Sequence, residues 1–285
     1  MRFCRLKGGD KILLYLFLNG RFVALEDIYA KPNIKSPGSI EEVIGNKELL
    51  DQLEQFTLPL DRAKNSGIML RSDQSYAVPF SNPGKIWSIG LNYGDHAKDL
   101  NVKQPEKPAS FMKPKSSMIT QGGDIILPKG FGRITAEAEL GIIIGKRGKY
   151  IEESDAMDYI FGIAPIIDMT AIDILLQNPR FLTMSKSFDT FFSIGPMIAT
   201  KDEFEDLQSL KISTIKNGVV EHSNYVRNML FSPEKLISFH SQIFTFEPGD
   251  IISTGTPGAV EIQRGDMVKC LIEGEDSISL ENKVL

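Results

Sequence analysis

The chain alternates short apolar runs with turns rich in glycine, proline and asparagine, which is typical of a protein dominated by β-strands. Asn19-Gly20 separates two such runs, 11–18 and 21–25, and predicts a hairpin between them. Helical patterns are fewer, and the first, at 39–55, begins with Ser39 and Glu42 in the spacing of a capping box. The remaining runs predict strands at 86–89, 139–144, 159–167, 210–216, 251–254 and 268–273, and helices at about 92–100, 170–177 and 233–243.

Proline and polar turns between residues 57 and 84 predict a domain boundary near 70–80. This divides the chain into a small N-terminal α/β domain, residues 1–75, and a larger domain, residues 76–285. The sequence has no βαβ alternation, no G-x-G-x-x-G and no phosphate-binding loop, which argues against the nucleotide-binding folds. We therefore expect an α+β protein with a mixed, β-rich core and a few inserted helices.

Two carboxylates, Glu137 and Glu139, precede the apolar run at 140–144. In a strand they share one face about 6.5–7 Å apart, while Leu140, Ile142 and Ile144 line the other. Carboxylates this close repel each other and are costly to bury, and a hard divalent cation between them would remove that cost. The alternative is that the strand ends in solvent with both side chains hydrated.

A third carboxylate, Asp168, ends the apolar run at 161–167. Thr170 and Asp173 have the spacing of a second capping box, so we expect Asp168 at a junction between a strand and a helix. There it could simply assist the helix cap. Together with the two glutamates it would instead complete a set of oxygen ligands suited to Mg²⁺ or Mn²⁺.

His96 and Asp99 are three residues apart on the helix predicted at 92–100 and share a face. A carboxylate beside an imidazole raises its basicity, as a general base requires. Gly90 and Gly94 would let this segment close as a lid. The alternative is a solvated surface helix that carries an incidental histidine.

Lys186 lies among hydroxyl residues and could hold a carboxylate or an enolate oxygen, although a surface lysine is the more common case in general. The segment 254–258, which contains Gly255 and Thr256, follows a predicted strand. Such a loop can offer backbone N–H groups and hydroxyls to an anion, or can be only a tight turn.

Composition excludes several classes of function. The formal net charge is −5 and no basic tract is present, so nucleic acid is an unsuitable partner. The chain has two widely separated cysteines and three histidines, which argues against a zinc site built from thiolates or imidazoles. The apolar run at 12–18 is too short to span a bilayer. We expect a cytoplasmic protein without a membrane partner.

Seven stretches occur together between residues 90 and 260 in a fixed order. They are GLNYGDHAKD (90–99), FMKPKSSMI (111–119), AEAELGIIIGKR (136–147), DMTA (168–171), KSFDTFFSIGP (186–196), NGVVEHSNYVRNMLF (217–231) and EPGDIISTGTPGAV (247–260). In combination they resemble the fumarylacetoacetate hydrolase family, in its small acylpyruvase-like branch. Because of this joint resemblance we prefer the metal site over hydrated carboxylates.

The resemblance implies a β-roll or β-sandwich core, a homodimer, and a catalytic Mg²⁺ or Mn²⁺. It implies metal ligands at Glu137, Glu139 and Asp168, activation of water by His96 with Asp99, and substrate contacts from Lys186, Gly255 and Thr256. The family usually has glutamate where this chain has Asp99.

Two positions depart from the family pattern. Four and seven residues after the metal-binding aspartate the family commonly carries arginine and glutamine that face the substrate, and here these are Ile172 and Leu175. The loss of a guanidinium and an amide removes fixed donors for a carboxylate or carbonyl. The exact substrate is therefore not fixed by the resemblance, and we expect one that is less anionic, or differently anchored, than an acylpyruvate.

Our main hypothesis from the sequence is a metal-dependent hydrolase that cleaves a C–C bond in a 1,3-dicarbonyl, acylpyruvate-like 2-oxo acid through a metal-bound enolate. One alternative is a decarboxylase or tautomerase of an oxaloacetate-like 2-oxo diacid, which needs the same enolate. Another is a catalytically silent metal-binding relative.

Overall fold

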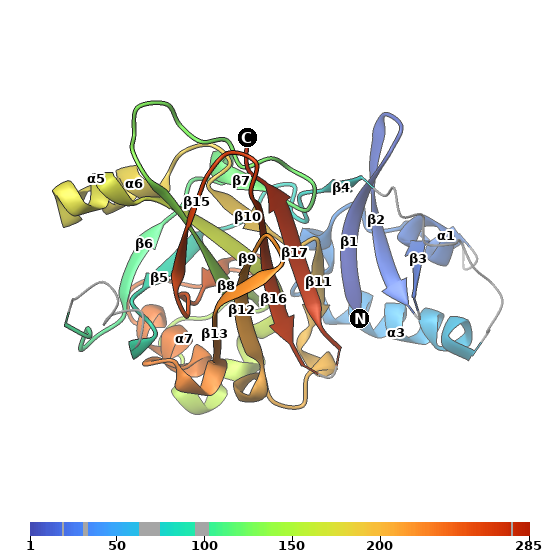
Figure 1. Ribbon diagram of the computed structural model, residues 1–285. Helices are drawn as coiled ribbons and strands as arrows, with labels where there is room; N and C mark the ends of the chain where they lie inside the picture. Colours follow the sequence, from blue (N-terminus) through green and yellow to red (C-terminus); the bar gives the residue numbers. More distant parts are fainter. Residues whose placement is uncertain (19, 31–33, 63–74, 95–102, 275) are drawn as a thin grey trace.

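The computed structural model describes the whole chain except residues 19, 31–33, 63–74, 95–102 and 275, and the side chains of 58–62. Strands dominate the described residues and form one 13-stranded and one 4-stranded sheet (Figure 1). The predicted β-rich α+β class is confirmed. None of the described helices combines the length and apolar character that a bilayer crossing requires.

The larger sheet contains β1 (Arg2–Gly8), β2 (Lys11–Leu18), β3 (Arg21–Ala24), β4 (Tyr76–Ala77), β5 (Ile86–Gly90), β6 (Ala109–Met112), β7 (Met118–Ile119), β8 (Ile134–Ile144), β9 (Ile160–Ala171), β10 (Phe192–Ile194), β11 (Met197–Thr200), β14 (Ile251–Ser253) and β15 (Ala259–Ile262). The smaller sheet contains β12 (Lys211–Lys216), β13 (Val219–Tyr225), β16 (Met267–Glu273) and β17 (Ile278–Lys283). The α-helices described are α1 (Leu25–Ala30), α2 (Ile40–Val43), α3 (Lys47–Arg62), α5 (Ile172–Gln177), α6 (Leu182–Lys186) and α7 (Pro233–Ser241).

The N-terminal hairpin is confirmed, because β2 and β3 pair antiparallel with Leu18 opposite Arg21. The single helix predicted at 39–55 is wrong: α2 ends before Gly45, whose φ of +76° is left-handed, and α3 begins after it. The predicted capping box also fails, since Ser39 makes no capping hydrogen bond with its side chain. Glu42 instead accepts a hydrogen bond from the backbone N–H of Gly38 at 3.3 Å.

The N-terminal strands join the rest of the molecule through the larger sheet. β1 pairs with β2 on one side and with β11 on the other, where Arg2 lies opposite Ala199. Phe3, Leu16 and Tyr29 pack in one buried cluster with Ile166 of β9, which we call the second core. The division of the chain at residue 75 stays a prediction.

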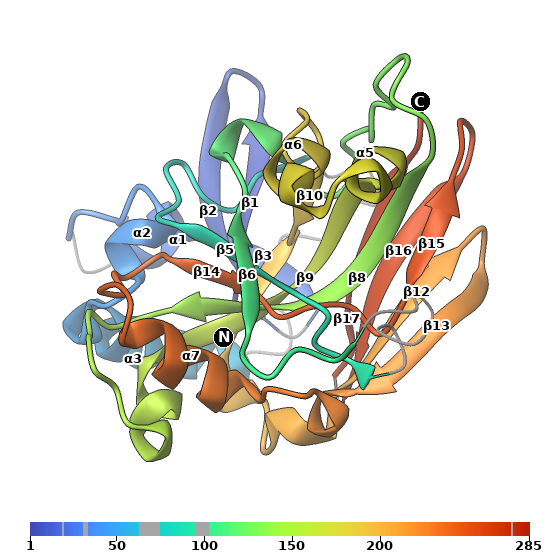
Figure 2. The ribbon, with the colours of Figure 1, turned by 90° about the vertical axis from the view of Figure 1, so that its left-hand side faces the viewer.

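The strands that surround the candidate site form a roll. Hydrogen-bonded neighbours run from β6 through β5, β14, β8, β9 and β10 to β7. Because residues 113–117 alone connect β6 to β7, the two ends of this path must curl toward each other. Figure 2 shows β8 and β9 crossing the middle of this arrangement, with α5 and α6 at one end.

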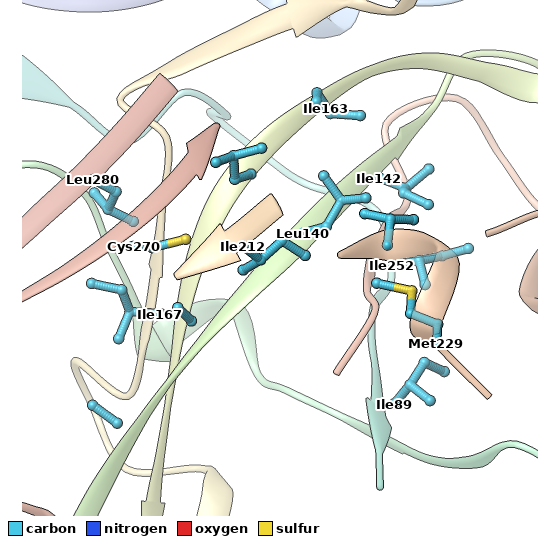
Figure 3. Close-up of a cluster of buried hydrophobic side chains, with 14 of the residues drawn as sticks. Ile89, Leu140, Ile142, Ile163, Ile167, Ile212, Met229, Ile252, Cys270 and Leu280 are labelled. Atoms are coloured by element: carbon cyan, nitrogen blue, oxygen red, sulfur yellow. The ribbon is translucent and has the colours of Figure 1, made fainter. Parts of the chain in front are cut away.

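The two central strands, β8 and β9, pair antiparallel and present two different faces. Leu140, Ile142 and Ile144 belong to the largest buried cluster, which we call the main core, whereas Ile143 belongs to the second core. The predicted alternation of these side chains is confirmed. Figure 3 shows the main core, where Ile212, Cys270 and Leu280 of the smaller sheet meet Leu140 and Ile167 of the larger one.

Candidate functional site

Three carboxylates converge on the face of β8 and β9 that is turned away from the main core. One ligand oxygen from each of Glu137, Glu139 and Asp168 lies within 4.8 Å of the others. Glu137 and Asp168 are direct cross-strand neighbours, which explains their proximity, and Glu139 lies two residues along the same face. The side chains are nearly enclosed, with exposed fractions of 8% for Glu137, 1% for Glu139 and 0% for Asp168.

Two buried lysines bind these carboxylates. Lys186, the last residue of α6, places Nζ 3.0 Å from Glu137 Oε2 and 2.9 Å from Asp168 Oδ2. Lys113, just after β6, places Nζ 2.6 Å from Asp168 Oδ1 and donates a second hydrogen bond to the carbonyl of Phe191 at 2.7 Å. The Phe111 ring lies under Lys186, with its centroid 5.1 Å from Nζ.

Neutral donors also bind oxygens of Glu137 and Glu139. The hydroxyl of Thr170 donates to Glu137 Oε1 at 2.6 Å. Glu139 Oε2 accepts hydrogen bonds from the Ser253 hydroxyl and from the backbone N–H of Gly255, the latter at 2.9 Å. Such bonds hold a carboxylate in one orientation, which is what ligands of a metal require.

Burial and close charges shift the pKa values of the site. Burial, reinforced by repulsion from Asp168, raises the pKa of Glu139 well above its ordinary value. Burial lowers the pKa of Lys113 to about 8 against the attraction of Asp168. Burial also opposes protonation of Lys186, but attraction by Asp168 and Glu137 outweighs it and raises the pKa of this ammonium.

The donor set fits a hard divalent cation. All three candidate ligands are carboxylates, the donors that Mg²⁺ and Mn²⁺ prefer. Two ammonium groups balance only two of the three negative charges, and repulsion by Asp168 adds to burial in raising the pKa of Glu139. Glu137, Glu139 and Asp168 are therefore the residues that would hold the ion.

The structure places the other predicted site residues as follows. Lys186 lies inside the cluster, and Gly255 donates to Glu139. Thr256 is buried, and its hydroxyl donates to the carbonyl of Gly258 at 2.9 Å within the same loop. His96 and Asp99 lie outside the described residues.

Lys113, Thr170 and Ser253 were not predicted as site residues. The predicted capping role of Thr170 is wrong: β9 extends to Ala171, so Thr170 lies inside the strand and Asp168 lies before its end rather than at a junction. Alternation with Asp168 was the signal that could have placed Thr170 on the site face. No local signal marks Lys113, because its contact with Asp168 depends on the curl of the roll.

Asn92 was also not predicted as a site residue, and its side chain binds the two segments beside the site that contain Phe231 and Thr254. Its side-chain N–H₂ donates to the carbonyls of Thr254 and Phe231, at 2.8 and 3.0 Å, and its oxygen accepts from the N–H of Phe231 at 2.9 Å. Gly255 packs so closely on Asn92 that an added Cβ would lie 2.8 Å from the Asn92 Cβ. This contact seats the loop that donates to Glu139.

Comparison with known proteins gives consistent matches. Residues 85–285 match the family described as Fumarylacetoacetate (FAA) hydrolase C-terminal. The human mitochondrial oxaloacetate tautomerase FAHD2A is 37% identical over 241 residues, which cover 80% of this chain and 77% of that protein. The rat mitochondrial oxaloacetate tautomerase Fahd2a is 38% identical over 211 residues, which cover 71% of this chain and 67% of that protein.

Solved structures match over the full length. The crystal structure of maleylpyruvate hydrolase from Sphingobium sp. SYK-6 is similar with a TM-score of 0.80 and 27% identity, covering 100% of this chain and 99% of that one. The same enzyme in complex with manganese(II) and pyruvate matches with a TM-score of 0.80 and 25% identity, with the same coverage of the two chains.

Proposed function

The chain belongs to the fumarylacetoacetate hydrolase family, and we propose that it is a divalent-metal-dependent hydrolase that cleaves a C–C bond in a 1,3-dicarbonyl 2-oxo acid through an enolate. The observation that carries this proposal is the cluster of three buried carboxylates within 4.8 Å, bound by two buried lysines. A site of this composition binds a cation and, through it, an anionic oxygen.

Mg²⁺ or Mn²⁺ held by Glu137, Glu139 and Asp168 would supply a positive charge that lowers the free energy of a negatively charged substrate oxygen. The manganese and pyruvate in the similar maleylpyruvate hydrolase support an ion of this kind and a 2-oxo acid ligand.

The chain's own residues have distinct parts in the proposal. Lys186 has three donor protons, and two carboxylates each accept one of them, so the third can be donated to an enolate oxygen. Lys113 orients Asp168, while the donors from Ser253 and Gly255 orient Glu139. Burial of the cluster excludes bulk water, which strengthens each of these interactions.

Water activation is assigned to His96 with Asp99 on the pattern of the sequence alone. The imidazole would take the proton of the attacking water, and Asp99 would fix its tautomer. Gly255 and Thr256 are proposed to contact the substrate, with Gly255 already adjacent to Glu139. The homodimer is likewise a prediction, and light scattering on the purified protein tests it.

A second candidate is the interconversion of the keto and enol forms of an oxaloacetate-like 2-oxo diacid. The 37–38% identity to the human and rat oxaloacetate tautomerases favours it. The two candidates share the enolate and differ in whether water attacks a second carbonyl.

Product analysis separates the candidates. The protein with Mg²⁺ or Mn²⁺ is incubated with acetylpyruvate and its longer homologues, and released pyruvate is measured; loss of the oxaloacetate enol absorbance is measured in parallel. Hydrolysis predicts release of pyruvate that His96→Ala abolishes. If the enol of oxaloacetate is still consumed by His96→Ala and no diketone releases pyruvate, the tautomerase is established instead. If the protein is inactive in both assays, both candidate functions are contradicted.

A further inference from the structure

We propose that Thr190 is a positioning residue of the carboxylate site, and that the strained turn to which it belongs holds Lys113 in place on Asp168. The inference rests on the metal site of the proposed function and adds a residue that acts through its neighbours. It depends on the backbone conformation of Thr190, on the place of the turn between two groups of the site, and on the hydrogen bond that the Thr190 side chain accepts.

Thr190 has a backbone conformation that costs free energy. Its φ of +68° lies in the left-handed region, which is unfavourable for a residue with a branched Cβ. The N–H of Phe191 donates to the carbonyl of Phe188 at 3.1 Å, so Thr190 is the third residue of a four-residue turn, 188–191. Glycine or asparagine is usual where the third residue of a turn is left-handed. A threonine kept at such a position indicates that its side chain has a use that glycine could not serve.

The turn connects two groups of the carboxylate site. Just before it, Lys186 at the end of α6 places Nζ 2.9 Å from Asp168 Oδ2. At its end, the carbonyl of Phe191 accepts a hydrogen bond from Lys113 Nζ at 2.7 Å, and the same ammonium lies 2.6 Å from Asp168 Oδ1. The course of the turn therefore determines how two ammonium groups meet the two oxygens of one candidate metal ligand.

Lys113 depends on the Phe191 carbonyl for its position. Its side chain is fully buried. Its ammonium also donates to the carbonyl of Met169, but at the longer distance of 3.4 Å. The Phe191 carbonyl is thus the closer of two backbone acceptors that hold the ammonium against Asp168. A shift of the turn would move this carbonyl and change the orientation in which Asp168 is presented to a cation.

The Thr190 hydroxyl explains why glycine would not serve here. Its Oγ1 accepts a hydrogen bond from the backbone N–H of Ile126 at 2.9 Å. The preceding residue, Ile125, donates its own N–H to the carbonyl of Lys283 at the end of β17, at 2.8 Å. The hydroxyl therefore ties the turn to a segment that is anchored on the smaller sheet. Glycine would permit the same backbone conformation but would leave the turn without this tie.

Equilibrium binding of Mn²⁺ tests the inference without an assay of turnover. Thr190→Gly removes the hydroxyl but relieves the strain, so the free energy of unfolding should stay close to the wild-type value. Its dissociation constant for Mn²⁺, measured by calorimetry, should nevertheless rise about threefold to tenfold, because a support of a metal ligand is loosened. Thr190→Ser keeps a hydroxyl on Cβ and should bind Mn²⁺ within about twofold of the wild type. Equal weakening by the two variants overturns the role of the hydroxyl.

Tyr150→Gly is the matched control for the relief of strain. Tyr150 is also left-handed, with a φ of +56°, but its side chain is 64% exposed and lies in the connection between β8 and β9. This variant should leave the dissociation constant for Mn²⁺ unchanged. A loss of affinity equal to that of Thr190→Gly would show that any added backbone freedom weakens the site, and the inference would be wrong.

A double-mutant cycle with Lys113→Met tests whether Thr190 acts through Lys113. In Lys113→Met the Phe191 carbonyl has no ammonium to hold, so adding Thr190→Gly should not weaken Mn²⁺ binding further. Additive losses, or wild-type affinity in Thr190→Gly, overturn the inference and leave the proposed function intact. If Lys113→Met does not fold, the comparison of Thr190→Gly with Thr190→Ser and Tyr150→Gly decides. If the wild type itself binds no Mn²⁺, the proposed function fails and the inference fails with it.

Discussion

The two faces of the β8–β9 pair share one backbone and differ sharply in what they carry. On the main-core face, Ala138, Leu140 and Ile142 are at most 1% exposed and their side chains belong to the apolar main core. On the opposite face, Glu137 and Glu139 are almost equally buried but are bound to lysines, hydroxyls and a backbone N–H.

The comparison shows that burial contributes to the free energy of folding with opposite sign on the two faces. On the apolar face, removal from water stabilises the fold by about 25 cal/mol per Å². On the carboxylate face, it costs free energy that ion pairs and hydrogen bonds only offset. The first face should therefore supply net stability, whereas the second should supply the binding of a metal and the reaction and should destabilise the fold only when one partner of an ion pair is removed.

The largest effect is expected from Asp168→Ala. This change leaves the buried Lys113 and Lys186 without their shared carboxylate, and should lower the free energy of unfolding by about 3–5 kcal/mol and abolish metal binding. Urea unfolding and calorimetry measure the two effects. Asp173→Ala, which removes the exposed ion pair with Arg133 and a hydrogen bond from its backbone N–H, is the control and should change little. Wild-type stability of Asp168→Ala would refute the importance of the buried pairs.

Leu140→Ala tests the other face of the same strand. The side chain is fully buried in the main core, so the cavity should cost about 3 kcal/mol of stability. The affinity for Mn²⁺, measured by calorimetry at a temperature where the variant stays folded, should remain at the wild-type value. A large loss of metal affinity would show that the two faces are coupled rather than independent.

Metal binding should itself stabilise the fold. Mn²⁺ at one hundred times its dissociation constant should raise the free energy of unfolding by about 2.7 kcal/mol. Glu139→Gln should lose this gain and be at least as stable as the wild type without metal, because it removes a repelling buried charge. Thermal unfolding with and without Mn²⁺ measures both effects, and a Glu139→Gln protein that metal still stabilises fully would exclude Glu139 as a ligand.

Thr170→Val should have a smaller effect confined to the carboxylate face. The hydroxyl that orients Glu137 is lost while the shape of the side chain is kept, so Mn²⁺ affinity should fall about tenfold, the lower end for supporting groups around a metal. Calorimetry measures the affinity. Thr214→Val, which alters a buried hydroxyl of β12 in the smaller sheet, is the matched control, and an equal loss in both variants would argue against a specific role for Thr170.

The smallest effect concerns a polar group near the main core. Burial lowers the pKa of His240 below its ordinary value of 6.5, although the hydrogen bond from Nδ1 to the Leu236 carbonyl opposes this. The ring binds a proton less readily in the folded protein than in the unfolded chain, so the stability that it contributes is present above about pH 6.5 and is lost as the pH falls. The slope should not exceed about 1.4 kcal/mol per pH unit. Urea unfolding between about pH 5.5 and 7 should show this slope in the wild type but not in His240→Gln.

Local pattern was sufficient for the N-terminal hairpin and for the sides of the strands. Asn19-Gly20 predicted the hairpin, and alternation predicted that Leu140, Ile142 and Ile144 lie opposite Ile143, because both depend on neighbours along the chain. The same kind of signal failed for the helix at 39–55 and for the role of Thr170. At both places the sequence has the spacing of a capping box, but the cap does not form. Ser39 makes no capping hydrogen bond with its side chain, and Thr170 lies inside β9.

The sequence by itself determined which side chains share a face, including the position of Glu137 beside Glu139, because the two-residue period of a strand is a property of the backbone. Only the tertiary structure decided that Asp168 lies opposite Glu137, that Lys113 reaches Asp168 across 55 positions of sequence, and that Ser253 and Gly255 hold Glu139. Those contacts depend on strand register and on the closure of the roll, which many weak packing interactions over the whole domain set together and which no short segment encodes.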